Sequence, residues 1–222
     1  MLRREGPGTE VAVIVSFEHD WLIDGEARTS FAGGLRRSQV ATEHAGRAHG
    51  MHIGLLPWAA RSLFELPMHE LAEASVPLDA LLPAGVERRL ASAASWEERF
   101  GLVDGLLARR LHGHAADPGV VWAWERLQST HGRASIGSLS EELGWSRKRL
   151  VARFREHVGL PPKAIARLFR FERARALAGT MSWAELAFAC GFSDQPHLIA
   201  EFRAITGRTP GTFLQDEAAA AA

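Results

Sequence analysis

Five basic side chains stand within nine residues, between Arg147 and Arg155. Three of them are consecutive and follow Ser146, a residue type that often begins a helix by accepting hydrogen bonds from its first turn. The first turn of a helix already carries partial positive charge, so three cations there repel that charge unless an anion lies opposite. Guanidinium and ammonium groups bind phosphates, and the segment therefore indicates contact with nucleic acid. The alternative is a solvated, charged helix surface.

The histidines raise the question of metal binding. They form two groups that are close in sequence: His44, His49 and His52 in one, and His112 and His114 in the other. Metal-binding β-barrels often carry a His-x-His pair with a glutamate a few residues on and a distant further histidine, and that pattern is missing. We therefore expect ordinary surface or loop histidines, with no metal and no cofactor.

Cys190 is the one cysteine of the chain. A single cysteine excludes an internal disulfide and any multi-cysteine zinc site. In the repeat described below it takes the place of Leu143, so we expect a small buried apolar residue and not a reactive thiol. With no nucleophilic cysteine before it and no convincing acid and base pair, the sequence does not indicate an enzyme.

The composition is that of an ordinary folded protein. The 222 residues suffice for two modest domains, and 46% are hydrophobic and 23% charged. There is no run of about 18 apolar residues and no apolar core of a signal peptide near the start, so the expected location is the cytoplasm, away from membranes. The net charge of zero is unevenly divided, because residues 120–215 contain 14 Lys and Arg against 8 Asp and Glu. The basic second half favours a polyanionic partner.

Residues 135–210 contain one unit twice. Gly144 aligns with Gly191 at an offset of 47, and one inserted residue then changes the offset to 48. The first matched pairs are Ser135 with Ser182, Leu139 with Leu186, Leu143 with Cys190, Trp145 with Phe192 and Ser146 with Ser193. The later pairs are Leu150 with Leu198, Phe154 with Phe202 and Gly159 with Gly207, and a proline follows each copy, Pro161 or Pro210.

Each copy has the pattern of two helices joined by a tight turn. Ser135 or Ser182 can cap the first helix, and Glu185 completes a capping box in the second copy. The glycine after this helix allows the left-handed conformation that ends it. The next helix turns Leu150 and Phe154 inward. This is the helix-turn-helix pattern, in which the first helix holds the second so that its amino-terminal, outward face enters the DNA major groove.

Residues 162–179 predict a long helix between the two units, with Pro162 near its start and Gly179 at its end. Its apolar side consists of Ile165, Leu168, Phe169 and Leu177, and its basic side of Arg167, Arg170, Arg173 and Arg175. Such a rod would fix the distance between two reading helices. Successive major grooves lie about 34 Å apart, so one chain would cover on the order of two turns of DNA.

The first half of the chain has a different pattern. From Val11 to Pro57 apolar, β-branched runs alternate with glycines, which predicts short strands, and the residues that follow predict helices. One of these helices opens with a capping box, Ser95 with Glu98, before an apolar face of Phe100, Val103, Leu106, Leu107 and Leu111. Roughly 45 residues have strand character, few for a complete eight-stranded barrel. We therefore expect a sheet that is partial or completed by another chain.

Residues 120–215 resemble the DNA-binding domain of the AraC family of bacterial transcription regulators. The segments that carry this resemblance are "LGWSRKRLVARFREHVGLPP", "RFERA" and "CGFSDQPHLIAEFRAITGRTPGTF". The resemblance implies seven helices with two recognition helices joined by a linker helix. It implies base-reading residues at Lys148, Val151, Ala152, Gln195, His197, Ile199 and Ala200, and phosphate-binding residues at Arg147, Arg149 and Ser193.

The segment "TEHAGRAHGMHIGLLPWAARSLFELPMHELA" is similar, more loosely, to the sensor region of a subgroup of the same family. The expected fold is therefore α+β. A β-rich, partly cupin-like sensor or dimerisation region ending in helices occupies residues 1–114. An all-α DNA-binding domain follows at 115–217, and 218–222 form a disordered tail. The candidate partners are double-stranded DNA, a small-molecule effector, RNA polymerase and a second copy of the chain.

Two other classes of function remain as alternatives. One is an enzyme that its helical half delivers to DNA, which would need a nucleophilic cysteine or a metal cluster in the first half. The other is a ligand-binding module without a nucleic-acid role. Salt-dependent association with DNA distinguishes the leading hypothesis from the second alternative.

Overall fold

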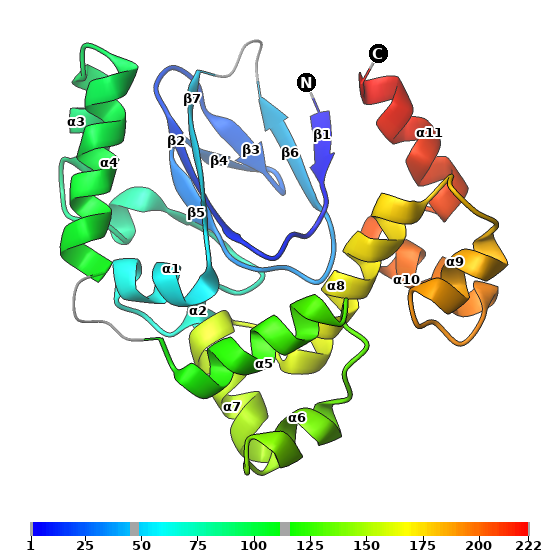
Figure 1. Ribbon diagram of the computed structural model, residues 1–222. Coiled ribbons are helices and arrows are strands. Elements are labelled where there is room, and N and C mark those ends of the chain that lie inside the picture. Colours follow the sequence, from blue (N-terminus) through cyan, green and yellow to red (C-terminus); the bar gives the residue numbers. More distant parts are fainter. Residues whose placement is uncertain (1, 45–48, 112–115, 222) are drawn as a thin grey trace.

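The computed structural model describes residues 2–44, 49–111 and 116–221. It has a β-sandwich formed by the first part of the chain and a set of helices formed by the rest (Figure 1). The predicted α+β class is confirmed. Within the described residues, no helix is both long and apolar enough to cross a membrane.

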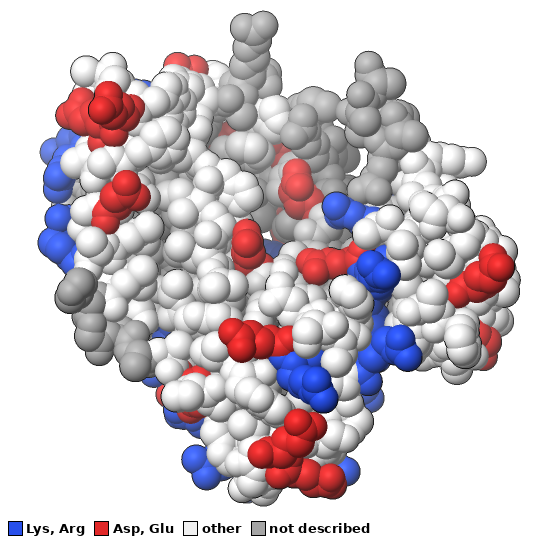
Figure 2. All heavy atoms as spheres, in the orientation of Figure 1, with Lys and Arg blue, Asp and Glu red and all other residues white. Residues whose placement is uncertain are grey.

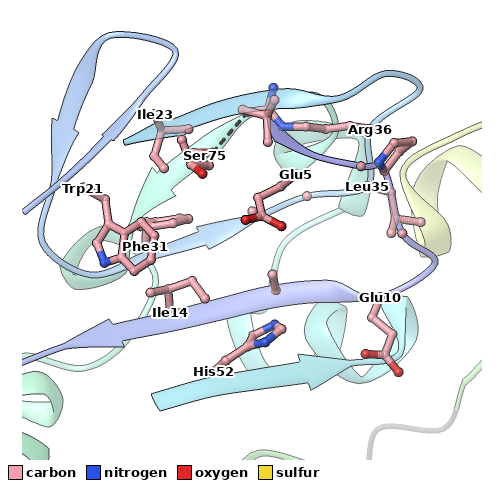
Figure 3. A pocket seen from close by; sticks show the side chains of 18 of the residues that line it. Glu5, Glu10, Ile14, Trp21, Ile23, Phe31, Leu35, Arg36, His52 and Ser75 are labelled. Atoms are coloured by element: carbon pink, nitrogen blue, oxygen red, sulfur yellow. Dashed lines mark hydrogen bonds between the residues drawn. The ribbon is translucent and has the colours of Figure 1, made fainter. Parts of the chain in front are cut away.

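The sandwich consists of two antiparallel four-stranded sheets. The first has the order β1 (Leu2–Glu5), β6 (Val40–His44), β3 (Trp21–Ile23) and β4 (Glu26–Arg28). The second has the order β7 (Gly50–Leu55), β2 (Val11–Ser16), β5 (Phe31–Gly33) and β8 (Ser75–Pro77). Side chains of β2 alternate, as the strand period of two requires: Val11, Val13 and Val15 are buried, while Ile14 is half-buried on the opposite side. The side of Ile14 faces the other sheet (Figure 3).

The expectation of a partial sheet is wrong, because this chain itself supplies both four-stranded sheets among its described residues. The strands are only three to six residues long, so few residues suffice. The sequence pattern missed two strands that lie outside the span from Val11 to Pro57. The first, β1, is largely charged, and β8 contains Pro77, which a strand tolerates at the edge of a sheet.

Among the described residues of the first half, four helices and a 3-10 turn accompany the strands: α1 (Pro57–Phe64), α2 (Met68–Leu71), η1 (Leu78–Ala80), α3 (Val86–Ser92) and α4 (Trp96–Leu111). The predicted cap of α4 forms, since Ser95 Oγ accepts from the Glu98 N–H at 3.2 Å. The predicted apolar face of α4 is only partly correct. Val103 is buried against the sheet, but Phe100 is 55% exposed and Leu111 36% exposed.

Residues 116–221 form seven helices, as the resemblance implies: α5 (Pro118–Ser129), α6 (Ile136–Glu142), α7 (Arg147–Val158), α8 (Pro162–Leu177), α9 (Trp183–Ala189), α10 (Gln195–Thr206) and α11 (Pro210–Ala221). Residues 218–221, for which the sequence predicts disorder, continue α11. Alanine has the highest helix propensity, so a run of alanines extends a helix that has already started.

The repeat reappears in three dimensions. The first helices of both units have seven residues and the second helices twelve. The glycines between them, Gly144 and Gly191, have φ of 64° and 77°, the left-handed conformation that the turn requires. Six matched residues have no exposed surface: Leu139, Leu150, Phe154, Leu186, Leu198 and Phe202. The same inward positions therefore build both units.

The two units differ in what they pack against. The core of the first unit includes Leu35, and Trp58 and Ala72 pack against it, so it is continuous with the first half of the chain. The second unit has a separate core, formed by the end of α8, α9, α10 and Phe213. A hydrogen bond from the Gln39 N–H to the Ile205 carbonyl joins the second unit to the β-sandwich at 2.8 Å. The first unit is thus the more firmly attached of the two.

Candidate nucleic-acid interface

The amino-terminal turn of α7 is exposed and basic. Ser146 Oγ accepts from the Arg149 N–H at 3.2 Å, which fixes the start of the helix as the sequence predicts. Arg147, Lys148 and Arg149 are all exposed. The guanidinium of Arg149 lies 4.6 Å from the centre of the Trp145 ring, a cation-π contact that holds one cation near the surface. The turn therefore presents three positive charges to solvent.

The next turns of α7 divide between surface and interior. Ala152 and Arg155 are exposed and Val151 is half-buried, so these side chains flank the basic turn. Arg153 is one of the five basic side chains between Arg147 and Arg155, which were expected on the exposed surface of the helix, but it is bound within the protein. Its Nε donates to Asp117 Oδ2 at 2.8 Å and its Nη1 to Glu156 Oε2 at 2.7 Å. Arg153 is therefore engaged by carboxylates of the protein itself.

Arg153 joins α7 to the start of α5. Asp117 caps α5 by accepting from the N–H groups of Gly119 and Val120, at 2.9 and 3.2 Å. Burial acts to raise the pKa of Asp117, but the hydrogen bonds from Arg153 and from these two backbone groups outweigh it, and the pKa is lowered. The ionised carboxyl group is thus favoured by the folded state.

We expect Asp117→Asn to destabilise the protein at neutral pH. Asparagine caps helices as well as aspartate does, so the change mainly removes the charge. Because the pKa of Asp117 is lower in the folded than in the unfolded state, its ionised carboxyl group stabilises the folded protein. This stabilisation is complete above the unfolded pKa, about 3.9, and is lost as the pH falls through the folded pKa. The difference in urea unfolding free energy between wild type and variant should therefore shrink from neutral pH to about pH 3. Glu125→Gln, on the exposed side of α5, is the control and should show no such pH dependence.

The second recognition helix begins one residue later than the repeat suggests. Its cap is Asp194 and not Ser193, and Asp194 Oδ1 accepts from the His197 N–H at 2.7 Å. The hydroxyl of Ser193 instead lies 3.0 Å from His197 Nδ1. The other ring nitrogen of His197, Nε2, is 3.8 Å from Glu201 Oε1. The imidazole is therefore oriented by contacts on both sides.

The outward surface of α10 is less basic than that of α7. Gln195 and Ala200 are exposed, and His197 and Ile199 are half-buried. A carboxylate, Asp194, occupies the position that Ser146 has in the first unit. The two exposed turns therefore differ in charge even though their backbones correspond.

Two arginines of the linker helix hold the second unit in place. Arg167 Nε donates to Glu201 of α10 at 2.8 Å. Arg170 donates to the carbonyl of Gly132 at 3.3 Å and lies 5.7 Å from the centre of the Phe192 ring. Burial lowers the pKa of Arg170, as expected for a guanidinium removed from water. In the sequence, Arg167 and Arg170 are recognisable only as part of the basic side of a helix. No sequence pattern shows which arginines of that side bind within the protein and which face solvent.

Figure 2 shows how the charges are distributed on one face of the molecule. Lysine and arginine side chains lie over α8 and between the two units, with carboxylates beside several of them, and aspartate and glutamate also lie over α6. Positive charge between the two helix-turn-helix units favours contact with a phosphate backbone.

The histidines do not form a metal site within the described residues, where no three His, Cys, Asp or Glu side chains are close enough to hold an ion. His44 is not a surface residue as predicted, because it is 7% exposed and its ring centre lies 4.9 Å from that of Trp21. His49 is paired with Glu18 at 2.9 Å. His112 and His114 lie outside the described residues. Cys190 is buried, as predicted, and burial raises the pKa of its thiol.

Comparisons with known proteins concern mainly the second half of the chain. A family model described as a helix-turn-helix domain matches residues 139–216. The xylose-binding transcription activator XylR is 25% identical over 45% of this chain and 27% of its own, with a TM-score of 0.40. The aligned region thus spans about a quarter of that protein. No curated protein sequence matches the chain.

A likeness in fold extends over both halves. The ligand-free K231A variant of ToxT from Vibrio cholerae aligns over 96% of each chain, with a TM-score of 0.51 and 9% identity. A further ToxT structure, described as bound to an unsaturated fatty acid, has a TM-score of 0.46, with 10% identity over 96% of this chain and 93% of its own. The family match and the repeated units agree, and they identify residues 139–216 as a helix-turn-helix domain.

Proposed function

We propose that the protein is a sequence-specific DNA-binding transcription regulator. The observation that carries this proposal is a pair of matching helix-turn-helix units whose second helices both expose their amino-terminal turns. In such units this turn enters the major groove. With the units joined by the single helix α8, one chain would reach two successive grooves, about 34 Å apart.

The exposed residues divide into two roles. Phosphate contacts come from Arg147, Arg149 and Ser193, and base contacts from Lys148, Val151, Ala152, Gln195, His197, Ile199 and Ala200. Alanine cannot make the bidentate contact with guanine that long polar side chains make, although its methyl group can touch thymine. Most of the hydrogen-bonded base reading therefore falls to Lys148 and Gln195.

The first half supplies regulation in this proposal. A cavity between its two sheets suits a small-molecule effector. Because the first half of the chain shares a core with the first helix-turn-helix unit, a bound effector can influence the position of that unit. A second copy of the chain and RNA polymerase are further proposed partners. We place this activity in the cytoplasm and assign no catalytic step to the protein.

The test separates specific from general DNA affinity. A preferred site is selected from random duplexes, and dissociation constants are measured for that site and for random DNA over a range of salt. We expect Lys148→Ala combined with Gln195→Ala to weaken the preferred site by about 1–3 kcal/mol per lost contact and random DNA far less. Arg147→Ala should weaken both and reduce the salt slope by about one.

Arg88→Ala is the matched control, because Arg88 is an exposed cation on α3, outside the DNA-binding half. It should leave both affinities unchanged. Equal losses on every sequence in the double variant would contradict specific readout. Absence of salt-dependent binding by the wild type would overturn the proposed function as a whole.

A further inference from the structure

A cavity of about 710 Å³ lies between the two sheets of the β-sandwich (Figure 3). This volume is in the range of sites that bind drug-sized molecules. Its apolar wall consists of Trp21, Ile23, Phe31 and Ile14, and the ring centres of Trp21 and Phe31 lie 6.5 Å apart with their planes inclined at 71°. The wall can therefore hold an apolar body and offers aromatic surface to it.

The charged groups of this cavity are mainly carboxylates: Glu5, Glu10 and Glu172 line it. Figure 3 shows the Glu5 carboxylate pointing into the space between the sheets. Arg36 also lines the cavity, but its guanidinium is engaged by Asp24 at 3.3 Å and by the Ser75 hydroxyl at 3.1 Å. Among the described side chains, the cavity thus has an excess of negative charge.

Thr42 gives independent reason to expect a bound molecule. It lines the cavity and is 5% exposed, and its Oγ1 has no hydrogen-bond partner among the residues that the structure describes. A buried hydroxyl without a partner is costly, by roughly 1–3 kcal/mol, and native proteins seldom leave one. A polar atom of a bound ligand would satisfy it.

Glu172 connects the cavity to the DNA-binding half. It lies on α8, the helix that joins the two helix-turn-helix units, while the other lining residues belong to the first half of the chain. Thr9 donates a hydrogen bond to Glu172 Oε1 across this boundary, at 3.4 Å. Burial, with a smaller contribution from Glu10, raises the pKa of Glu172, against the opposing effects of Thr9 and Arg175. A nearby cation would therefore relieve an electrostatic cost in the folded protein.

We propose that the cavity binds an organic cation, an amine or ammonium compound with an apolar body, between the aromatic wall and the carboxylates of Glu5, Glu10 and Glu172. The aromatic faces favour a cation as well as an apolar surface, because the ring quadrupole attracts positive charge. A carboxylate ligand would face three like charges, with Arg36 already engaged. This inference rests on the proposed regulatory function for its biological meaning, since a ligand that touches α8 acts on the helix that spaces the two units.

The test uses the full chain and two matched sets of probes. One set is phenylbutylamine, phenylbutanol and phenylbutanoate, and the other is decylamine, decanol and decanoate. Isothermal titration calorimetry gives the affinities, and the shift in melting temperature gives a second readout. We expect the amine of at least one set to bind at least about tenfold more tightly than its alcohol, and the carboxylate to bind most weakly.

Glu5→Gln, Glu10→Gln and Glu172→Gln remove one charge each while keeping the size of the side chain. Each variant that retains the wild-type circular dichroism should lose about tenfold or more in amine affinity. Glu70→Gln, an exposed carboxyl group on α2 that does not line the cavity, should lose none. Any of three results would overturn the proposal. These are an amine affinity that is unchanged in all three variants, a carboxylate probe that binds more tightly than its amine, and no binding of either amine.

DNA binding by the ligand-free protein is measured separately. If that binding is present and the amines do not bind, the cavity assignment fails and the regulator remains. If the amines bind as expected and DNA does not, the cavity assignment stands and the proposed function fails.

Discussion

Replacing Phe202 with alanine should unfold the second helix-turn-helix unit and leave the rest of the chain folded. Phe202 has no exposed surface, and its ring contacts those of Phe171 and Phe213 with centres 5.0 and 6.0 Å apart. Loss of a buried phenylalanine side chain costs about 3–5 kcal/mol. The core that contains it is small and separate from the other two cores, so the damage should remain local.

Hydrogen exchange measured by mass spectrometry checks this expectation. Amides of α9 and α10 should exchange much faster in Phe202→Ala, while those of α5, α7 and the β-sandwich keep their protection. Phe154→Ala, at the matching position of the first unit, should instead increase exchange in α7 and in the helices α1 and α2 that pack on it. Phe188→Ala is the control, because Phe188 is 84% exposed. Global unfolding of Phe202→Ala would show that the core of the second unit is not independent of the rest of the protein.

Gly132→Ala should destabilise the helical half, residues 116–221, more than a change from glycine to alanine at any other position of that half. The φ angle of Gly132 is 73°, so alanine would adopt an unfavourable left-handed conformation at a cost of roughly 1–2 kcal/mol. A Cβ atom there would also lie 2.0 Å from the carbonyl oxygen of Ala166 in α8. Because that oxygen belongs to the helix backbone, the turn before α6 must move, which adds about 1–3 kcal/mol.

Gly144→Ala separates the two causes. Its φ angle is similar, 64°, but a Cβ atom at Gly144 would have no neighbour within 4 Å. This variant should therefore show the conformational cost alone. Urea denaturation followed by circular dichroism measures both variants, and equal losses would mean that the close approach of Gly132 to α8 does not contribute.

The second half of the chain could be predicted from sequence because its information is local and repeated. Capping serines, a turn glycine and apolar residues spaced by four specify a helical unit within about 25 residues. The second copy then confirms which positions matter. Leu150, Phe154, Leu198 and Phe202, assigned inward from their spacing, are all fully buried.

What could not be predicted depends on contacts between distant residues. The strand β1 pairs with β6 some forty positions later, and its own sequence has no strand pattern. Arg153 and Arg167 look like free cations in the sequence, yet Asp117 and Glu201 bind them. The helix α10 begins one residue later than the repeat predicts, because Asp194 and not Ser193 is its cap. Both residue types are good caps, so the sequence did not distinguish them. The cavity carboxylates come from separate segments and leave no common motif.

The unequal charge of the two exposed helix turns has a consequence for how the protein would leave its target. Arg147, Lys148 and Arg149 surround the start of α7, whereas a carboxylate, Asp194, caps α10. Ions added to the solution compete mainly with arginine and lysine for phosphates. Rising ionic strength would therefore weaken the contacts of α7 with DNA first. The contacts of α10, which would depend on shape and on base edges, would weaken less. Dissociation would then begin at the end of the DNA site that α7 occupies.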